Sequence, residues 1–256
     1  MQLGFIGTGA ITSALVTGLC TTKSSVDSIW VSSRSETISH QLQERFPQVQ
    51  IGNSNQEVVD RSDVVVLAFL PQQKEEVLKV LRFRKEQTII HLLSGTRNTQ
   101  ISELLNAPCK IVRSVPLPCA ANHIGPIAVY PDNQIVNKIF TPLGTVVTVD
   151  KEEQLELLSA ITAFMAPYFE MVAQVIDWSV DNGVKQQQAA QYSASMFEAL
   201  SLMAKESVDG NVHQLIQESQ TPGGLNALAM QVIKEQGGFD FVKTALDAVK
   251  SRVMEG

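Results

Sequence analysis

The first fifteen residues constrain the fold more than any other stretch of this chain. Residues 3–6 form a short apolar run without polar alternation, as expected of a strand that is buried on both faces of a parallel sheet. Gly7 and Gly9 follow directly, and a helical pattern begins behind them. Gly7 permits a tight turn, Gly9 has no Cβ to keep a phosphate off the backbone, and the N–H groups that open the helix would face that anion. The stretch predicts a strand, a glycine turn and a helix that together hold a dinucleotide.

The match to the dinucleotide pattern G-x-G-x-x-G is imperfect at its third position. Thr12 stands where Gly or Ala would let the helix and the strand pack more closely. An ordinary turn after a first strand is therefore the alternative interpretation of Gly7 and Gly9.

Strands and helices alternate up to about residue 105, which is the pattern of an α/β fold. Residues 68–71 lie at the carboxyl end of the strongest predicted strand, so we expect them to face the cofactor beside the glycine turn. Apolar runs predict strands at residues 3–6, 28–31, 49–52, 64–70, 88–93, 110–115, 127–130 and 144–149. From Lys151 on the strand pattern disappears and helical periodicity takes over, with Pro167 expected to bend or end the first helix, and later helices expected at 186–207, 226–236 and 239–253. We therefore expect a doubly wound Rossmann-type sheet in residues 1–150, followed by an all-α domain in residues 151–256.

Composition excludes several classes of protein. The formal net charge of −6 and the lack of a basic stripe argue against a nucleic-acid partner. The longest apolar runs, such as residues 64–70, are too short to span a bilayer, and the N-terminus lacks the features of a signal peptide. The 3 cysteines have neither metal-ligand nor C-x-x-C spacing. We expect a cytoplasmic protein with reduced thiols and no membrane partner.

The residues behind the second predicted strand indicate which dinucleotide fits. In this fold that position meets the adenosine ribose, and an NAD site places Asp or Glu there. Here the stretch Ser32-Ser33-Arg34-Ser35 supplies two or three hydroxyls and a guanidinium, which would bind a 2′-phosphate that a carboxylate would repel. The predicted cofactor is NADP(H). In the alternative interpretation, Arg34 is a solvated loop residue and Ser35 caps a helix.

No side chain is predicted with a catalytic role, and no metal site is predicted. The 4 histidines lack metal-ligand spacing, and His91 in a buried strand is interpreted as a core histidine. His123, in a proline-rich loop, is the one candidate proton donor, if that loop lies near the nicotinamide. The Pro-Gly-Gly sequence at residues 222–224 indicates a turn, and its N–H groups at the start of a helix could also hold a carboxylate.

The order of several motifs resembles the pyrroline-5-carboxylate reductase family over essentially the whole chain. These motifs are Phe5-Ile6-Gly7-x-Gly9, Ser33-Arg34, Asp63-Val64-Val65-x-x-Ala68-x-x-Pro71, Arg113-x-Val115-Pro116, Tyr168-Phe169, Asp181-x-Gly183-Val184, Thr221-Pro222-Gly223-Gly224 and Gly237-Gly238-Phe239. The resemblance implies an N-terminal Rossmann domain and a helical domain that interlocks with a second subunit. It also implies that NADPH reduces a cyclic imine to proline in a homodimer or higher homo-oligomer.

The resemblance also carries site residues over to this sequence. The cofactor contacts it implies are Gly7, Thr8, Gly9, Ala10, Ile11, Ser33, Arg34, Asn55, Ala68, Pro71 and Gly95, and the substrate loop it implies comprises Thr221, Gly223, Gly224 and Asn226. The chain departs from the family pattern mainly around the substrate. Leu225 and Asn226 replace two threonines, and Phe164 and Met165 stand in a stretch that the family fills with small residues.

These observations predict NADPH-dependent reduction of 1-pyrroline-5-carboxylate to proline by hydride transfer. Two alternatives stay open. The first is an NADP-dependent reductase of another imine or carbonyl substrate, which the added apolar residues favour. The second is a nucleotide-binding regulator without turnover.

Overall fold

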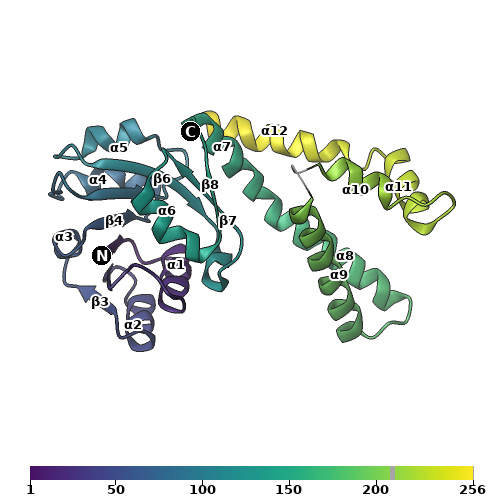
Figure 1. Ribbon diagram of the computed structural model, residues 1–256, viewed down its shortest axis with the longest axis horizontal. Coiled ribbons are helices and arrows are strands. Elements are labelled where there is room, and N and C mark those ends of the chain that lie inside the picture. The colour runs from purple at the N-terminus through teal and green to yellow at the C-terminus, as the bar shows by residue number, and fades with distance from the viewer. Residues whose placement is uncertain (208–210, 256) are drawn as a thin grey trace. The chain divides into compact units, whose positions relative to one another are not determined.

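The computed structural model describes residues 1–207 and 211–255 and divides the chain into two compact units (Figure 1). The N-terminal unit comprises Met1–Ala160 with the segment from Lys250 on, and the helical unit comprises Ile161–Val249. The boundary between the two compact units follows Ala160, ten residues after the domain boundary expected at 150. The reason is that helix α7 (Glu152–Ile161) belongs to the sheet: its Leu155 is fully buried and its Glu156 is ion-paired with the sheet residue Arg113.

The described residues of the N-terminal unit contain one eight-stranded sheet in the order β3-β2-β1-β4-β5-β6-β7-β8. Its strands are β1 (Gln2–Ile6), β2 (Ser28–Ser32), β3 (Val49–Gly52), β4 (Val64–Leu67), β5 (Thr88–His91), β6 (Lys110–Pro116), β7 (Pro126–Tyr130) and β8 (Thr145–Thr148). All neighbours are parallel except β6 and β7. The expected strands and the α/β class are confirmed. Strand β4 is shorter than its apolar run, because the chain leaves the sheet after Leu67.

Helices cover both faces of this sheet. In chain order they are α1 (Ala10–Cys20), α2 (Glu36–Arg45), α3 (Asn55–Asp60), α4 (Lys74–Leu78), α5 (Asn98–Leu104) and α6 (Gln134–Phe140), with short 3₁₀ turns at η1 (Pro71–Gln73), η2 (Pro118–Asn122) and η3 (Thr141–Leu143). Alternate residues of β4 enter separate cores: Val64 and Val66 pack with α1, α2 and α6, whereas Val65 and Leu67 pack with α3, α4 and α5. The continuous apolar run of β4 is thereby explained, since neither of its faces meets water.

The helical unit contains α8 (Met165–Asp181), α9 (Gln186–Glu206), α10 (Val212–Glu218) and α11 (Leu225–Glu235), and most of α12 (Asp240–Glu255). The sequence did not predict α10. A 3₁₀ turn, η4 (Thr162–Phe164), interrupts the helical pattern just before α8, so Pro167 lies in the first turn of a new helix, where its missing N–H costs little. Large apolar side chains of this unit are exposed, including Phe169 at 62%, Trp178 at 68% and Tyr192 at 75%.

One helical stretch of the described residues bears on the expectation about membranes. The helical run Glu152–Asp181, which joins α7, η4 and α8, is long and apolar enough to cross a bilayer by length and composition alone. Its apolar residues are interspersed with polar ones, so it contains no long uninterrupted apolar run.

Candidate functional site

A crevice of about 500 Å³ lies where the strand order of the sheet reverses. Strand β2 pairs with one edge of β1, and β4 pairs with the opposite edge of β1. The loops that follow β1, β2, β4 and β5 all contribute to its walls. Ligands of open α/β sheets bind at this switch point, beyond the carboxyl ends of the strands.

The glycine turn forms the floor of the crevice. Gly7 has φ of +99°, and a Cβ at this position would stand 2.3 Å from the carbonyl oxygen of Ala68. No other side chain fits there, so Gly7 is required by both conformation and space. A Cβ on Gly9 would meet nothing within 4 Å, because Gly9 borders the open cavity. The backbone at the start of α1 is therefore accessible to a ligand.

Hydroxyl groups hold this turn in place. The Gly7 N–H donates to Ser32 Oγ at 2.9 Å, and the Thr8 hydroxyl donates to the Ser32 carbonyl oxygen. Thr12 is fully buried and donates to the Gly7 carbonyl oxygen at 2.7 Å. The imperfect third position of the glycine pattern is thus compensated, because the Thr12 hydroxyl donates to a buried turn carbonyl, which the side chain of Gly or Ala could not do.

Arg34 and Ser35 form the wall behind β2. The exposed guanidinium of Arg34 donates from Nη1 to Gln73 Oε1 at 2.8 Å, so a residue of η1 holds it at the rim of the crevice. Ser35 precedes α2, but its side chain accepts no capping hydrogen bond. Both side chains line the crevice, and none of the described residues that line it is acidic.

The crevice brings together some of the predicted cofactor residues and not others. Those that line it are Gly7, Thr8, Gly9, Ile11, Arg34 and Ala68. Those that do not are Ala10, Ser33, Asn55, Pro71 and Gly95. Asn55 opens α3 behind the cap Ser54, and Pro71 and Gly95 line a neighbouring cavity of about 400 Å³, which shares Leu70 with the crevice.

Three residues that line the crevice, Ile38, Gln73 and Leu92, were not expected from the sequence. Ser35, Phe69 and Leu70 also line it, and they belong to the two stretches that were expected to face the cofactor. Ile38 lies in the first turn of α2, four residues beyond Arg34, so proximity in sequence could have indicated it. Gln73 and Leu92 carry no such signal, because only the pairing of β4 with β1 and of β5 with β4 brings η1 and the end of β5 to the crevice.

The predicted substrate loop belongs to the helical unit. Gly223 has φ of +74° and the Gly224 N–H donates to the Thr221 carbonyl oxygen at 2.9 Å, which is the pattern of a type II turn with Pro222 at its second position. Gly224 then caps α11. The amide of Asn226 donates to the Ser219 carbonyl oxygen at 3.1 Å. The turn and the helix start are confirmed, while the side chain expected as a ligand donor is used within the loop.

Neither of the two histidines considered from the sequence lines the crevice. His123 contacts Thr21, Nε2 to Oγ1, at 3.1 Å. Thr21 caps the far end of α1, roughly 16 Å from the glycine turn by the rise of an 11-residue helix. The structure therefore places His123 outside the crevice, and its role as a proton donor stays a prediction.

His91 is fully buried, as expected, with Nε2 in a 2.8 Å contact to Asn98 Oδ1, but its Nδ1 has no partner. Burial, together with the charge of Arg113, lowers the pKa of His91 to about 3, even though the contact with Asn98 opposes the shift. The side chain is therefore neutral at physiological pH. Among the described residues no group of three or more His, Cys, Asp or Glu is placed to hold a metal ion.

Comparisons with known proteins agree with this geometry. The family model described as NADP oxidoreductase, coenzyme F420-dependent, matches residues 2–95, and the model for pyrroline-5-carboxylate reductase dimerisation matches residues 152–255. The chain is 24% identical to pyrroline-5-carboxylate reductase 1 of Bacillus subtilis over 99% of its own length and 89% of that protein.

Two solved structures have the same fold. The 1-pyrroline-5-carboxylate reductase of Streptococcus pyogenes superposes with a TM-score of 0.86 at 22% identity, covering 100% of this chain and 99% of that one. The Plasmodium falciparum pyrroline carboxylate reductase with NADP bound gives a TM-score of 0.84 at 22% identity, over 100% and 97% of the two chains. Two family models in succession and curated relatives matched along nearly their full length lead to one conclusion: the chain belongs to the pyrroline-5-carboxylate reductase family.

Proposed function

We propose that this protein is an NADPH-dependent reductase that converts 1-pyrroline-5-carboxylate to proline. The observation that carries the proposal is the crevice at the carboxyl ends of β1 and β4, with Arg34 and Ser35 behind β2 and no acidic lining residue among those described. The family of the chain and the solved neighbour with NADP bound support the same cofactor.

The residues of the crevice fit a dinucleotide phosphate. Gly9 leaves open space beside the first N–H groups of α1, an 11-residue helix whose dipole favours an anion there. Arg34 is the guanidinium that would bind the 2′-phosphate, with the unused Ser35 hydroxyl beside it. We also assign cofactor contacts to the predicted residues outside this cavity, Ala10, Ser33, Asn55, Pro71 and Gly95, on the basis of the family resemblance.

The proposed chemistry asks little of the protein's side chains. Bound NADPH supplies a hydride to the carbon of the C=N bond. Substrate that enters as the iminium already carries the proton on nitrogen, which suits a crevice with no acidic or histidine side chain among its described lining residues. The task of the chain is then to orient the imine against the cofactor and to exclude water.

We assign the substrate carboxylate to the loop of Thr221, Gly223, Gly224 and Asn226. The type II turn leaves Gly224 as the cap of α11 without a side-chain hydrogen bond, so the first N–H groups of that helix are available to an anion. Leu225, 85% exposed, follows the cap and presents an apolar surface to whatever binds there. This exposed leucine is the observation that favours the second candidate function, reduction of a more apolar imine.

The helical unit is assigned to subunit pairing. It lies within the match to the dimerisation family, and its exposed aromatic residues, such as Phe169 and Trp178, require a partner surface. We assign α8, which forms the second part of the apolar run Glu152–Asp181, to this interface and not to a membrane, in a cytoplasmic homodimer or higher homo-oligomer. In this division residues 1–150 bind the cofactor and residues 151–256 pair the subunits and bind the substrate.

Oxidation of NADPH, followed by fluorescence with 1-pyrroline-5-carboxylate and a panel of other cyclic imines and ketones, tests the proposal. We expect steady turnover with 1-pyrroline-5-carboxylate and formation of proline in equal amount. Turnover with other imines alone would favour the second candidate. Binding of NADPH without turnover on any compound would refute the enzymatic proposal and favour a nucleotide-binding regulator.

A further inference from the structure

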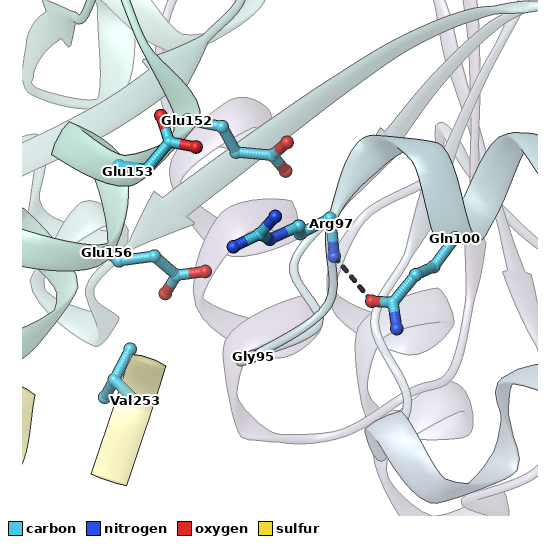
Figure 2. A pocket seen from close by; sticks show the side chains of 7 residues that line it. All are labelled: Gly95, Arg97, Gln100, Glu152, Glu153, Glu156 and Val253. Atoms are coloured by element: carbon cyan, nitrogen blue, oxygen red, sulfur yellow. Dashed lines mark hydrogen bonds between the residues drawn. The ribbon is translucent and has the colours of Figure 1, made fainter. Parts of the chain in front are cut away.

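A second cavity, of about 340 Å³, lies in the N-terminal unit outside the crevice. It is bounded by the loop between β5 and α5, by the first turns of α7 and by the last turn of α12 (Figure 2). Three glutamates of α7 (Glu152, Glu153 and Glu156) line it together with Arg97. It shares no lining residue with the crevice, although Gly95, which is assigned a cofactor contact above, lines both this cavity and the cavity that adjoins the crevice.

The cavity lies over a buried ion cluster with an excess negative charge. Arg113 of β6 is 1% exposed and donates from Nη1 to Glu156 Oε1, and the same nitrogen is 3.6 Å from Glu152 Oε1. One guanidinium thus faces two carboxylates. Glu152 also accepts the backbone N–H of Asn98 at 2.8 Å. Around the cavity as a whole, Arg113 and Arg97 face the three carboxylates of Glu152, Glu153 and Glu156, so one further cation would balance the charge.

One carboxylate oxygen of the cluster lacks a hydrogen-bond donor. Glu156 is 8% exposed, and its Oε2 is buried without a hydrogen-bond partner. A buried carboxylate oxygen without a donor is costly, and native structures rarely leave one unpaired. An N–H donor that carries a positive charge meets both requirements.

Arg97 supplies the opposite charge across the same cavity. Its exposed guanidinium forms no ion pair with the residues that the structure describes, and Figure 2 shows it directed toward the carboxylates of α7. Its backbone N–H is already used by Gln100 Oε1 at 2.9 Å, which anchors the residue at the rim. The cavity therefore holds one carboxylate oxygen without a partner, Glu156 Oε2, and one guanidinium without an ion pair among the described residues, that of Arg97.

We propose that this cavity is an effector site for a small zwitterion of the α-amino acid class. The ammonium group donates to Glu156 Oε2 and contacts Glu153, and the carboxylate binds the Arg97 guanidinium. A cavity of about 340 Å³ accommodates such a molecule, and the mixed charge of its walls discriminates against ligands that carry only one of the two charges. The inference does not depend on the proposed reaction, because binding is measured without cofactor and without imine.

Equilibrium binding of L-proline and L-alanine to the full-length protein tests this site. We expect Arg97→Ala and Glu153→Gln each to weaken binding at least tenfold, because each removes one end of the charge pair from an exposed position that folding does not require. Arg82→Ala and Glu103→Gln remove the same charges from exposed positions outside the cavity and are expected to change affinity less than twofold. Pyrrolidine and cyclopentanecarboxylate, which each lack one charge, are expected to bind at least tenfold more weakly than L-proline.

Two outcomes would overturn the proposal. One is the absence of binding by either amino acid to the unmodified protein. The other is binding that Arg97→Ala and Glu153→Gln leave unchanged, which would place the amino acid elsewhere, including the imine site. Neither outcome bears on turnover of NADPH with imines, so failure of the effector site and failure of the reductase assignment are distinguishable.

Discussion

Replacing Arg34 by alanine tests the cofactor assignment most directly. The guanidinium has five N–H donors, and one of them is engaged by Gln73 Oε1 at 2.8 Å, so the others remain for a 2′-phosphate. A hydrogen bond to a charged group contributes about 1.5–3 kcal/mol. Loss of the contact should therefore weaken NADPH binding roughly 10- to 150-fold. NADH has no 2′-phosphate, so its affinity should change less than about twofold.

The assay is titration of NADPH and NADH fluorescence with Arg34→Ala, Gln73→Ala and Arg82→Ala. Gln73→Ala frees the guanidinium without removing it, so its NADPH affinity should fall by less than about tenfold, in keeping with loss of a positioning hydrogen bond of about 0.5–1.5 kcal/mol. Arg82 is exposed and outside the crevice, so its variant controls for net charge. Equal losses for NADPH and NADH in Arg34→Ala, or no loss at all, would refute the role of Arg34 at the 2′-phosphate.

Three further changes test the packing around the sites. Gly7→Ala places a Cβ at a position with positive φ, 2.3 Å from the Ala68 carbonyl oxygen. The free energy of unfolding should therefore fall by at least about 1–3 kcal/mol, and NADPH binding should be lost. A urea denaturation curve that matches that of the unmodified protein would contradict this prediction. Glu156→Gln leaves the buried cation of Arg113 without its main counter-charge, so the free energy of unfolding from urea denaturation should fall by about 3–5 kcal/mol. A decrease of less than about 1 kcal/mol would show that the ion pair is dispensable. The pKa of His91 is lowered to about 3 in the folded state from an ordinary value near 6.5, so on acidification the unfolded chain binds a proton at this residue before the folded chain does. The contribution of neutral His91 to the free energy of unfolding is therefore complete above about pH 6.5 and decreases as the pH falls toward 3. Replacement of His91 by glutamine should flatten that part of the stability–pH curve, and an unchanged slope would show that another group causes it.

Much of the N-terminal unit could be predicted because its signals are local. Apolar runs without alternation mark strands that are buried on both faces, and all of those expected are present in the sheet. Gly7 needs a positive φ that few residues adopt, and this requirement is visible in the residue type alone. Thr12 could not be interpreted in this way, because its value lies in a hydrogen bond to the Gly7 carbonyl oxygen that only the folded turn creates.

The helical half was predicted less completely. Its hydrophobic periodicity indicated helices, but α10 has only seven residues, which is too short a segment for a clear helical periodicity. The loop at Gly223 was recognisable as a turn from Pro-Gly-Gly, whereas the use of the Asn226 amide within that loop depends on where Ser219 ends α10. Side-chain roles in loops follow from such neighbours, which the sequence does not encode by spacing.

The sequence by itself determined the α/β class, the glycine turn, the hydroxyl and guanidinium behind the second strand, and the helical second half. These features follow from backbone sterics and hydrophobic periodicity, which act over a few neighbouring residues. Tertiary structure alone decided that His123 lies at the far end of α1, that Gln73 holds Arg34, and that Arg113 is buried beneath the glutamates of α7. These contacts join residues 39 to 102 positions apart, and packing of the sheet and its helices, not local preference, selects them.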